Sequence, residues 1–531
     1  MSSIHGRNGK DVLKRIAHRV MEERGFQPDF SRAALDELDR IQAFDWGAEA
    51  HWKDLRQLPW VSIDNDDSLD LDQLTAAEVL PDERVRILVA VADVDVLVKI
   101  NSAIDEHARW NTTSVYTAGQ TFPMLPERLS TNLTSLNYGE DRPAIVIEMT
   151  ISNQGEIEGS DIYHAAVRNH AKLAYSNVAA WLQADGPAPD EAVAAQPSLA
   201  ESLRVQDRVA QELRSQRHRR GALDLQTLEA RPVFAGDEIQ DLRVEVTNRA
   251  KQIIEDFMIA ANDVTARFLR LKEVASLRRV VRSPRRWDRI VEVAAQQGYR
   301  LPPQPDSKAL SAFLTEQKTA DPLRFPDLSL TIVKLLGSGE YVVELPGGTA
   351  PGHFGLAVKD YTHSTAPNRR FPDLITQRIL KATVAGSATP YSQAELEQLA
   401  GHCTEKEDDA NKVERLVAKS AAAMLLSSRI GDQFDAICTG AANKGTWVRI
   451  FRPPIEGRLL YGFEGVDVGY RLRVRLIYTD VDRGFIDFEK VRSQPHDTGT
   501  SSGIALGHPD PKKVGHEKAL ASGVAGRGWH P

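Results

Sequence analysis

The chain has 531 residues, of which 42% are apolar and 26% are charged, and 66 Lys and Arg against 74 Asp and Glu give a formal net charge of −8. This composition is typical of globular proteins with buried cores, and it excludes a disordered or fibrous chain and a small basic nucleic-acid module. Two cysteines, Cys403 and Cys438, lie far apart without zinc-binding spacing and predict a reduced, cytoplasmic protein. The start shows no signal peptide, and Asp93 and Asp95 interrupt the most apolar stretch, so we expect no membrane contact.

Residues 1–57 predict an N-terminal helical domain. Leu13, Ile16 and Val20 recur at helical spacing, Gly25 is a stop signal, and Ser31 is placed to cap a second helix. Two such helices suit either a helix-turn-helix that reads DNA or, at least as well, a hairpin that packs or docks.

Residues 58–427 predict a mixed α/β domain. Apolar alternation and β-branched runs mark its strands, a period near 3.6 marks its helices, and prolines mark a loop or insertion. We expect strands at 60–63 and 85–91, helices at 250–269 and from about Asp408, and the loop around 187–197.

Residues 428–490 contain short strands separated by Gly and Pro, which predict a small barrel of the OB-fold type. Arg471, Arg473 and Arg475 alternate there with apolar residues, and Trp447 supplies a ring for stacking. This strand face is either a surface that binds single-stranded RNA or a solvated face. Residues 491–531 are poor in apolar residues and predict a disordered tail.

An acidic cluster, SIDNDDSLDLDQL, follows the first predicted strand and contains Asp64, Asp70 and Asp72. Carboxylates this crowded repel one another unless a cation binds them. An EF-hand counted from Asp64 would need Gly and Glu where Leu69 and Thr75 stand, so that site is excluded. Oxygen ligands without His or Cys favour Mg²⁺, with Mn²⁺ as the alternative, and such ions serve phosphodiester hydrolysis.

Two arginine-rich stretches are candidates for binding phosphate. One runs from Arg278 to Arg289 and is equally compatible with a solvated helix face. The other is the pair Arg369 and Arg370, directly before a predicted helix start.

From Ser62 to about Leu425 the chain resembles the catalytic domain of the ribonuclease II/R, or RNB, family of exoribonucleases. The resemblance rests on spaced blocks in order, among them SIDNDDSLDLDQL, ILVAVADVDVLV, HRRGALDL, KQIIEDFMIAAN, GHFGLAVKDYTHSTAPNRRFPDLITQRILKA and ANKVER. It implies a mixed α+β RNB core followed by an OB-fold RNA-binding barrel. It also implies processive Mg²⁺-dependent hydrolysis of RNA from the 3′ end to nucleoside 5′-monophosphates.

The resemblance implies a role for individual residues. Asp64, Asp70 and Asp72 would bind the metal and complete the catalytic site, together with Arg369 at the scissile phosphate. RNA would be contacted by further residues, namely Tyr116 (stacking on the terminal base), Tyr175 (lining the channel), Glu414 (near the ribose), Arg370, and Trp447, Arg471, Arg473 and Arg475 of the barrel.

The sequence departs from the family at three places. Gln73 stands where a fourth aspartate is expected, so it can offer a metal a carbonyl oxygen without charge. No aromatic residue stands near Ala275–Ser276, where a second stacking ring is expected. Helices replace the two barrels that usually precede the RNB domain, which would widen the channel mouth and admit structured RNA.

The leading hypothesis is therefore a monomeric, cytoplasmic exoribonuclease that acts on single-stranded RNA or RNA with a 3′ overhang. The alternative is a catalytically weak or inactive RNB-fold protein that binds RNA as a regulator, because Gln73 replaces an aspartate. A DNA-binding regulator rests on the N-terminal helices alone.

Overall fold

The computed structural model describes residues 9–46, 52–184, 188–226, 230–244, 247–442 and 444–491. The predicted tail, beyond Val491, lies outside these residues. Within the described ranges, no helix combines the length and the apolarity needed to cross a membrane.

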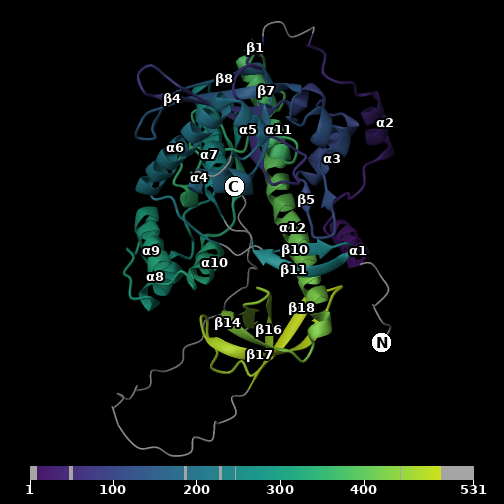
Figure 1. Ribbon diagram of the computed structural model, residues 1–531, viewed down its shortest axis with the longest axis vertical. Coiled ribbons are helices and arrows are strands. Elements are labelled where there is room, and N and C mark those ends of the chain that lie inside the picture. The colour runs from purple at the N-terminus through teal and green to yellow at the C-terminus, as the bar shows by residue number, and fades with distance from the viewer. Residues whose placement is uncertain are drawn as a thin grey trace, which may run out of the picture.

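A seven-stranded, mixed sheet forms the upper part of the molecule (Figure 1). Its order is β1-β8-β7-β4-β3-β2-β9. The predicted strands at 60–63 and 85–91 are confirmed as β2 and β4, and β4 is buried on both faces. The strands are β1 (Lys53–Asp54), β2 (Val61–Asp64), β3 (Gln73–Val79), β4 (Val85–Ala92), β7 (Asp141–Ile151), β8 (Ile157–Arg168) and β9 (Ala171–Ala174).

Three two-stranded ribbons lie outside this sheet. They are β5 (Val115–Tyr116) with β6 (Thr121–Phe122), β10 (Ala230–Ala235) with β11 (Glu238–Val244), and β12 (Ser276–Val280) with β13 (Glu340–Glu344).

Helices cover the sheet and connect it to the rest of the chain. They are α1 (Gly9–Glu23), α2 (Arg32–Arg40), α3 (Ala103–Asn111), α4 (Tyr175–Ala184), α5 (Glu191–Ala195), α6 (Pro197–Arg220), α7 (Arg249–Leu271), α8 (Trp287–Gln296), α9 (Ser307–Ala320), α10 (Phe325–Leu336), α11 (Phe371–Val384) and α12 (Gln393–Leu426).

Three of these helices differ from the prediction. The stretch expected to be a loop around 187–197 leads into α5 and the 24-residue α6, which begins at Pro197, a residue that favours the first helical position. The last long helix begins well before Asp408, because Ser392 and Glu395 form a capping box at its start. It runs through the centre of the molecule from the sheet to the barrel (Figure 1).

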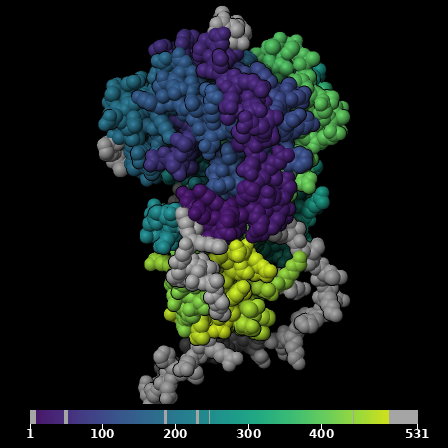
Figure 2. All heavy atoms as spheres, turned by 90° about the vertical axis from the view of Figure 1, so that its right-hand side faces the viewer, coloured from purple at the N-terminus to yellow at the C-terminus, as the bar shows by residue number. Residues whose placement is uncertain are grey.

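The N-terminal helices form as predicted, and the Ser31 side chain caps α2 by accepting a hydrogen bond from the Ala34 N–H at 3.2 Å. They pack on different partners, since α1 lies mainly against α12 and α2 against α3. Figure 2 shows the N-terminal segment spread over one face, between the sheet region and the barrel. This arrangement favours a docked N-terminal segment over a helix-turn-helix unit.

The C-terminal strands close into a barrel, which confirms the predicted OB-type fold. Leu459, Val474 and Phe488 fill its core, and Ala423 and Leu426 at the end of α12 extend that core. The barrel strands are β14 (Gln433–Ala442), β15 (Gly445–Ile450), β16 (Glu456–Tyr461), β17 (Arg471–Asp480) and β18 (Phe485–Lys490).

Candidate active site

The acidic cluster lies at one edge of the large sheet. Asp64 ends β2, and Asp72 stands directly before β3. The buried carboxylate of Asp72 accepts a hydrogen bond from the Asn368 N–H at 3.0 Å and faces the Nε of Arg369 at 3.2 Å. Two predicted catalytic residues from distant parts of the chain thus meet in one ion pair.

The carboxylates of Asp64 and Asp72 lie where burial reduces their contact with water. Burial raises the pKa of Asp72 to about 7, which the neighbouring Arg369 charge opposes and the Asp70 charge reinforces. Burial also raises the pKa of Asp64, against a hydrogen bond from the Asn65 N–H at 2.7 Å. A cation bound beside these carboxylates would relieve this penalty, so the donor chemistry suits a hard divalent ion. Within the described ranges, however, no three His, Cys, Asp or Glu side chains stand ready as a metal cage.

Tyr116, on β5, joins the same cluster. Its hydroxyl donates a hydrogen bond to Asp70 Oδ2 at 2.9 Å, while its side chain is 43% exposed. Its backbone N–H donates to Glu414 Oε1 on α12 at 2.9 Å. Glu414 therefore holds the Tyr116 backbone, in addition to any contact with a ribose.

The two adjacent arginines have different surroundings. Arg369 offers its carbonyl oxygen to the Ser114 N–H at 2.9 Å, which ties it to the segment before Tyr116. Arg370 Nε pairs with Asp373 Oδ2 at 2.9 Å, so this guanidinium supports the loop. Its contact with RNA stays a prediction.

Sequence reasoning did not single out Asp373 and Asn368. Asp373, in the first turn of α11, accepts hydrogen bonds from the N–H groups of Thr365 and Ala366, each at 2.8 Å. Asn368 binds Asp72 through its backbone. An acidic residue in the first turn of the helix after Arg370 was the available signal for the loop anchor.

Gln73, at the predicted fourth aspartate position, is also bonded to this loop. Its Nε2 donates to the carbonyl oxygen of Thr365. Only the Oε1 atom of Gln73 is then available to a metal ion.

Tyr175 lies at the same sheet edge as Asp64. It follows Ala174, the residue that pairs with Asp64 between β9 and β2. Its ring is half-buried, and Lys251 Nζ lies 5.7 Å from the ring centroid. This register places Tyr175 beside the end of β2 that carries Asp64.

The predicted barrel residues form a separate group, in the barrel that follows the C-terminal end of α12 (Figure 1). Leu472, Val474 and Leu476 of β17 point into the core while the intervening arginines are exposed, as predicted. Arg473 pairs with Asp435 at 3.3 Å and Arg475 pairs with Glu489 at 3.2 Å. Half-buried Trp447 lies beside these strands on β15. The basic face is therefore partly neutralised by acids on neighbouring strands.

The stretch from Arg278 to Arg289 divides between the interior and the surface, since Arg282, Arg285, Arg286 and Arg289 are exposed. Arg278 is buried and pairs with Glu344 at 3.1 Å, and Arg279 pairs with Glu407 at 2.6 Å. The first residues of the stretch form β12 rather than a helix face. Their charges stabilise the interior.

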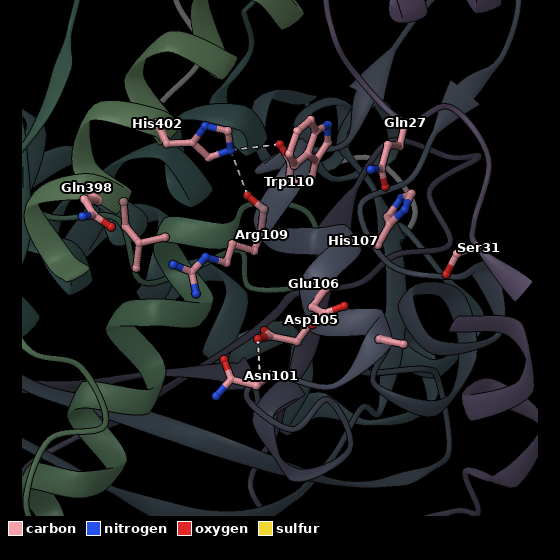
Figure 3. A pocket seen from close by; sticks show the side chains of 12 residues that line it. Gln27, Ser31, Asn101, Asp105, Glu106, His107, Arg109, Trp110, Gln398 and His402 are labelled. Atoms are coloured by element: carbon pink, nitrogen blue, oxygen red, sulfur yellow. Dashed lines mark hydrogen bonds between the residues drawn. The ribbon is translucent and has the colours of Figure 1, made fainter. Parts of the chain in front are cut away.

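A cavity of about 680 Å³ is lined by α3, by α12 and by the segment that leads into α2 (Figure 3). None of the predicted site residues lines it. At its wall, His402 Nε2 lies 3.0 Å from the carbonyl oxygens of both Arg109 and Trp110, which ties the end of α3 to α12.

Comparisons with known proteins agree with this geometry. Residues 52–386 match the RNB domain, and residues 432–491 match the RNase II-type exonuclease C-terminal S1 domain. Ribonuclease R of Escherichia coli is 31% identical over 495 residues, which cover 86% of this chain and 59% of that protein. The chain thus spans less than two thirds of that relative.

Solved structures show the same fold. Mycoplasma genitalium RNase R in complex with double-stranded RNA is 25% identical with a TM-score of 0.80, over 91% of this chain and 84% of that one. Yeast Ssd1, a pseudonuclease, is 14% identical with a TM-score of 0.66, over 84% of this chain and 55% of that one. The fold is therefore found in a ribonuclease and in a pseudonuclease.

Proposed function

The chain belongs to the RNB family of ribonuclease II/R proteins, and on that premise we propose that it is a 3′-to-5′ exoribonuclease that hydrolyses RNA to nucleoside 5′-monophosphates. The observation that carries this proposal is the ion pair between Asp72 and Arg369, beside the hydrogen bond between Asp70 and Tyr116. By resemblance these four residues match family positions, and they come from three distant segments of the chain. Their meeting in one cluster supports a catalytic site.

RNB exoribonucleases use a divalent metal ion. Asp64, Asp70 and Asp72 would hold it, and we propose Mg²⁺, with Mn²⁺ as the alternative. When bound, such an ion activates a water molecule and stabilises the leaving oxygen.

The remaining side chains would place the substrate. Arg369, held by Asp72 and always protonated, would stabilise negative charge on the scissile phosphate. The exposed ring of Tyr116 would stack on the terminal base without sequence preference. Tyr175 would line the approach, and Glu414 would act near the ribose and through Tyr116.

The proposal is tested by incubating the full chain with 5′-labelled oligo(A) and either Mg²⁺ or Mn²⁺. Release of mononucleotides supports it, and Asp72→Asn should lower the rate at least about 100-fold, because a ligand and the Arg369 partner are lost together. Asp66→Asn removes an exposed carboxylate from the same loop and should leave the rate within about twofold of the wild type. Equal rates for the two variants would contradict the assignment.

The second candidate is an RNA-binding regulator without hydrolytic activity. Gln73 favours it, because the amide replaces a charged ligand and is already bonded to Thr365. In the same assay, RNA that stays intact while bound would identify this function.

We further propose that the enzyme enters structured RNA, because Mycoplasma genitalium RNase R, which has the same fold, was solved in complex with double-stranded RNA. A duplex with a short 3′ overhang should be degraded past the junction. Stalling several nucleotides before the junction would show that only single-stranded RNA is admitted. The monomeric state and the cytoplasmic location stay predictions.

A further inference from the structure

The hairpin that carries Tyr116 lies between the N-terminal helix and the long helix. Val115 and Phe122, one from each strand of the hairpin, share a buried cluster with Leu13 of α1 and Val413 of α12. Leu13, Val115 and Val413 are fully buried. The hairpin therefore has no packed core of its own and depends on both helices.

The turn of this hairpin touches the backbone of α1. Thr117 closes the turn, since its Oγ1 donates to the Gln120 carbonyl at 2.7 Å and accepts from the N–H groups of Gly119 and Gln120 at 3.2 and 3.1 Å. A Cβ atom at Gly119 would stand 2.7 Å from both the Leu13 carbonyl carbon and the Lys14 nitrogen. Such a contact is far below van der Waals distance, and helix backbone cannot rotate away as a side chain can. Position 119 therefore requires glycine, because the turn lies too close to the α1 backbone for a Cβ atom.

The opposite side of the hairpin is held at the active site. Glu414 accepts the hydrogen bond from the Tyr116 backbone, and the Tyr116 hydroxyl reaches Asp70. A shift of the turn against α1 would therefore move the ring and hydroxyl of Tyr116 relative to the aspartates.

We propose that α1 is a positioning element of the nucleotide-binding site and that Gly119 is the positioning residue through which it acts on Tyr116. This inference rests on the proposed function, in which Tyr116 holds the terminal nucleotide. Helix α1 precedes residues 52–386, the part that matches the RNB domain, so the match itself gives α1 no role.

The first test compares Gly119→Ala with Gly401→Ala in the full chain. Gly401 lies on α12, where an added Cβ atom would meet nothing within 4 Å, so it provides the same chemical change without a clash. Affinity for a five-nucleotide oligo(A) is measured by fluorescence anisotropy in EDTA. Gly119→Ala should weaken binding about tenfold, the scale of one lost base stack, and Gly401→Ala should not. Wild-type affinity in Gly119→Ala would overturn the proposal.

A double-mutant cycle separates positioning from general destabilisation. In a Tyr116→Ala background, Gly119→Ala should cause no further loss of affinity. An additional loss as large as in the wild-type background would overturn the proposal.

A second variant and a second measurement guard against misfolding. Leu13→Ala loosens α1, whereas Leu310→Ala removes the same side chain from the separate, fully buried cluster of α8 to α10. Amide hydrogen exchange at residues 115–122 should rise in Leu13→Ala and not in Leu310→Ala. Equal exchange in both would overturn the proposal. These binding and exchange measurements need no hydrolysis, so failure of the wild type to release mononucleotides would refute the exoribonuclease function alone.

Discussion

Asp72 and Gln73 are neighbours in the chain, and both bind the segment that precedes α11. Asp72 accepts from Asn368 and faces Arg369, whereas Gln73 donates to the carbonyl of Thr365. An ionised aspartate at position 73 has no hydrogen to donate. The amide therefore fixes the two loops together at a position where a carboxylate would attract metal.

Gln73→Asp should exchange these two effects. The added charge should tighten Mg²⁺ binding about tenfold. The lost hydrogen bond should lower the free energy of unfolding by about 1 kcal/mol. Calorimetric titration with Mg²⁺ and thermal unfolding measure both quantities. Gln73→Asn, which shortens the amide without adding charge, should lose stability and gain no affinity; tighter metal binding in both variants would contradict the explanation.

The acidic cluster could be predicted from sequence because its members stand within nine positions of one another. Asn368 could not, since its contribution is a backbone N–H that meets Asp72 only after folding. Arg278 was misjudged for a related reason. Its partner Glu344 is 66 residues away, and charge density in the sequence does not reveal that an ion pair is buried.

At the scale of elements, the β12–β13 ribbon covers a group of buried rings. Tyr341 bonds through its hydroxyl to His363 Nδ1 at 2.8 Å, and the His353 ring lies 5.4 Å from that of Tyr361. His353 also accepts a hydrogen bond from the Leu356 N–H at 3.2 Å. Burial, with the Arg279 charge second, lowers the pKa of His353 to about 3. The packing therefore requires a neutral imidazole.

His353 should make the fold sensitive to acid. The unfolded chain takes up a proton below the ordinary pKa of about 6.5, whereas the folded chain resists until about 3, so stability falls as pH falls through this window. At pH 5 the cost is about 2 kcal/mol relative to neutral pH. His353→Asn keeps a capping acceptor without titrating, so urea unfolding at pH 7.5 and 5 should show a smaller loss for the variant. An equal loss in both would contradict the role of this residue.

Elements with a clear period were predictable, and elements defined by tertiary contacts were not. The alternation in β17 correctly predicted a barrel strand with one apolar face. Helix α6 was missed because prolines precede it and its polar residues mask the buried Leu199, Leu203 and Leu213. A local sequence pattern does not reveal an element whose buried face is defined by contacts with another element.

At the scale of the whole molecule, the net charge of −8 says little about RNA binding, because local potential determines contact with phosphate. The described barrel, with its exposed arginines, follows the C-terminal end of α12, whereas Glu414, which bonds to Tyr116 beside the aspartates, lies 12 residues before that end. These 12 residues span about 18 Å at the usual helical rise. Long RNA could contact both regions, and a short oligonucleotide could contact one.

RNA length should therefore separate the two regions. Trp447→Ala should weaken binding of a 30-nucleotide RNA about tenfold and leave that of a five-nucleotide RNA unchanged. Arg471 pairs in register with Ile437, an uncharged residue on the neighbouring strand. Arg471→Ala should therefore lower the salt dependence of RNA affinity by the equivalent of about one phosphate contact. Arg475→Ala, whose guanidinium already pairs with Glu489, should change it less. Anisotropy titrations at several salt concentrations measure these effects; equal losses for both RNA lengths would contradict a separate barrel site.

The contact between Gly119 and the backbone of α1 bears on how such proteins diversify. A glycine inside the matched domain fits against a helix that lies outside it, so we expect the two segments to be exchangeable only together. If the N-terminal segment were exchanged between relatives, the hairpin turn would lose the α1 backbone against which Gly119 fits. Recombination at residue 52 would therefore separate a fitted pair, and viable exchanges should carry position 119 together with its helix.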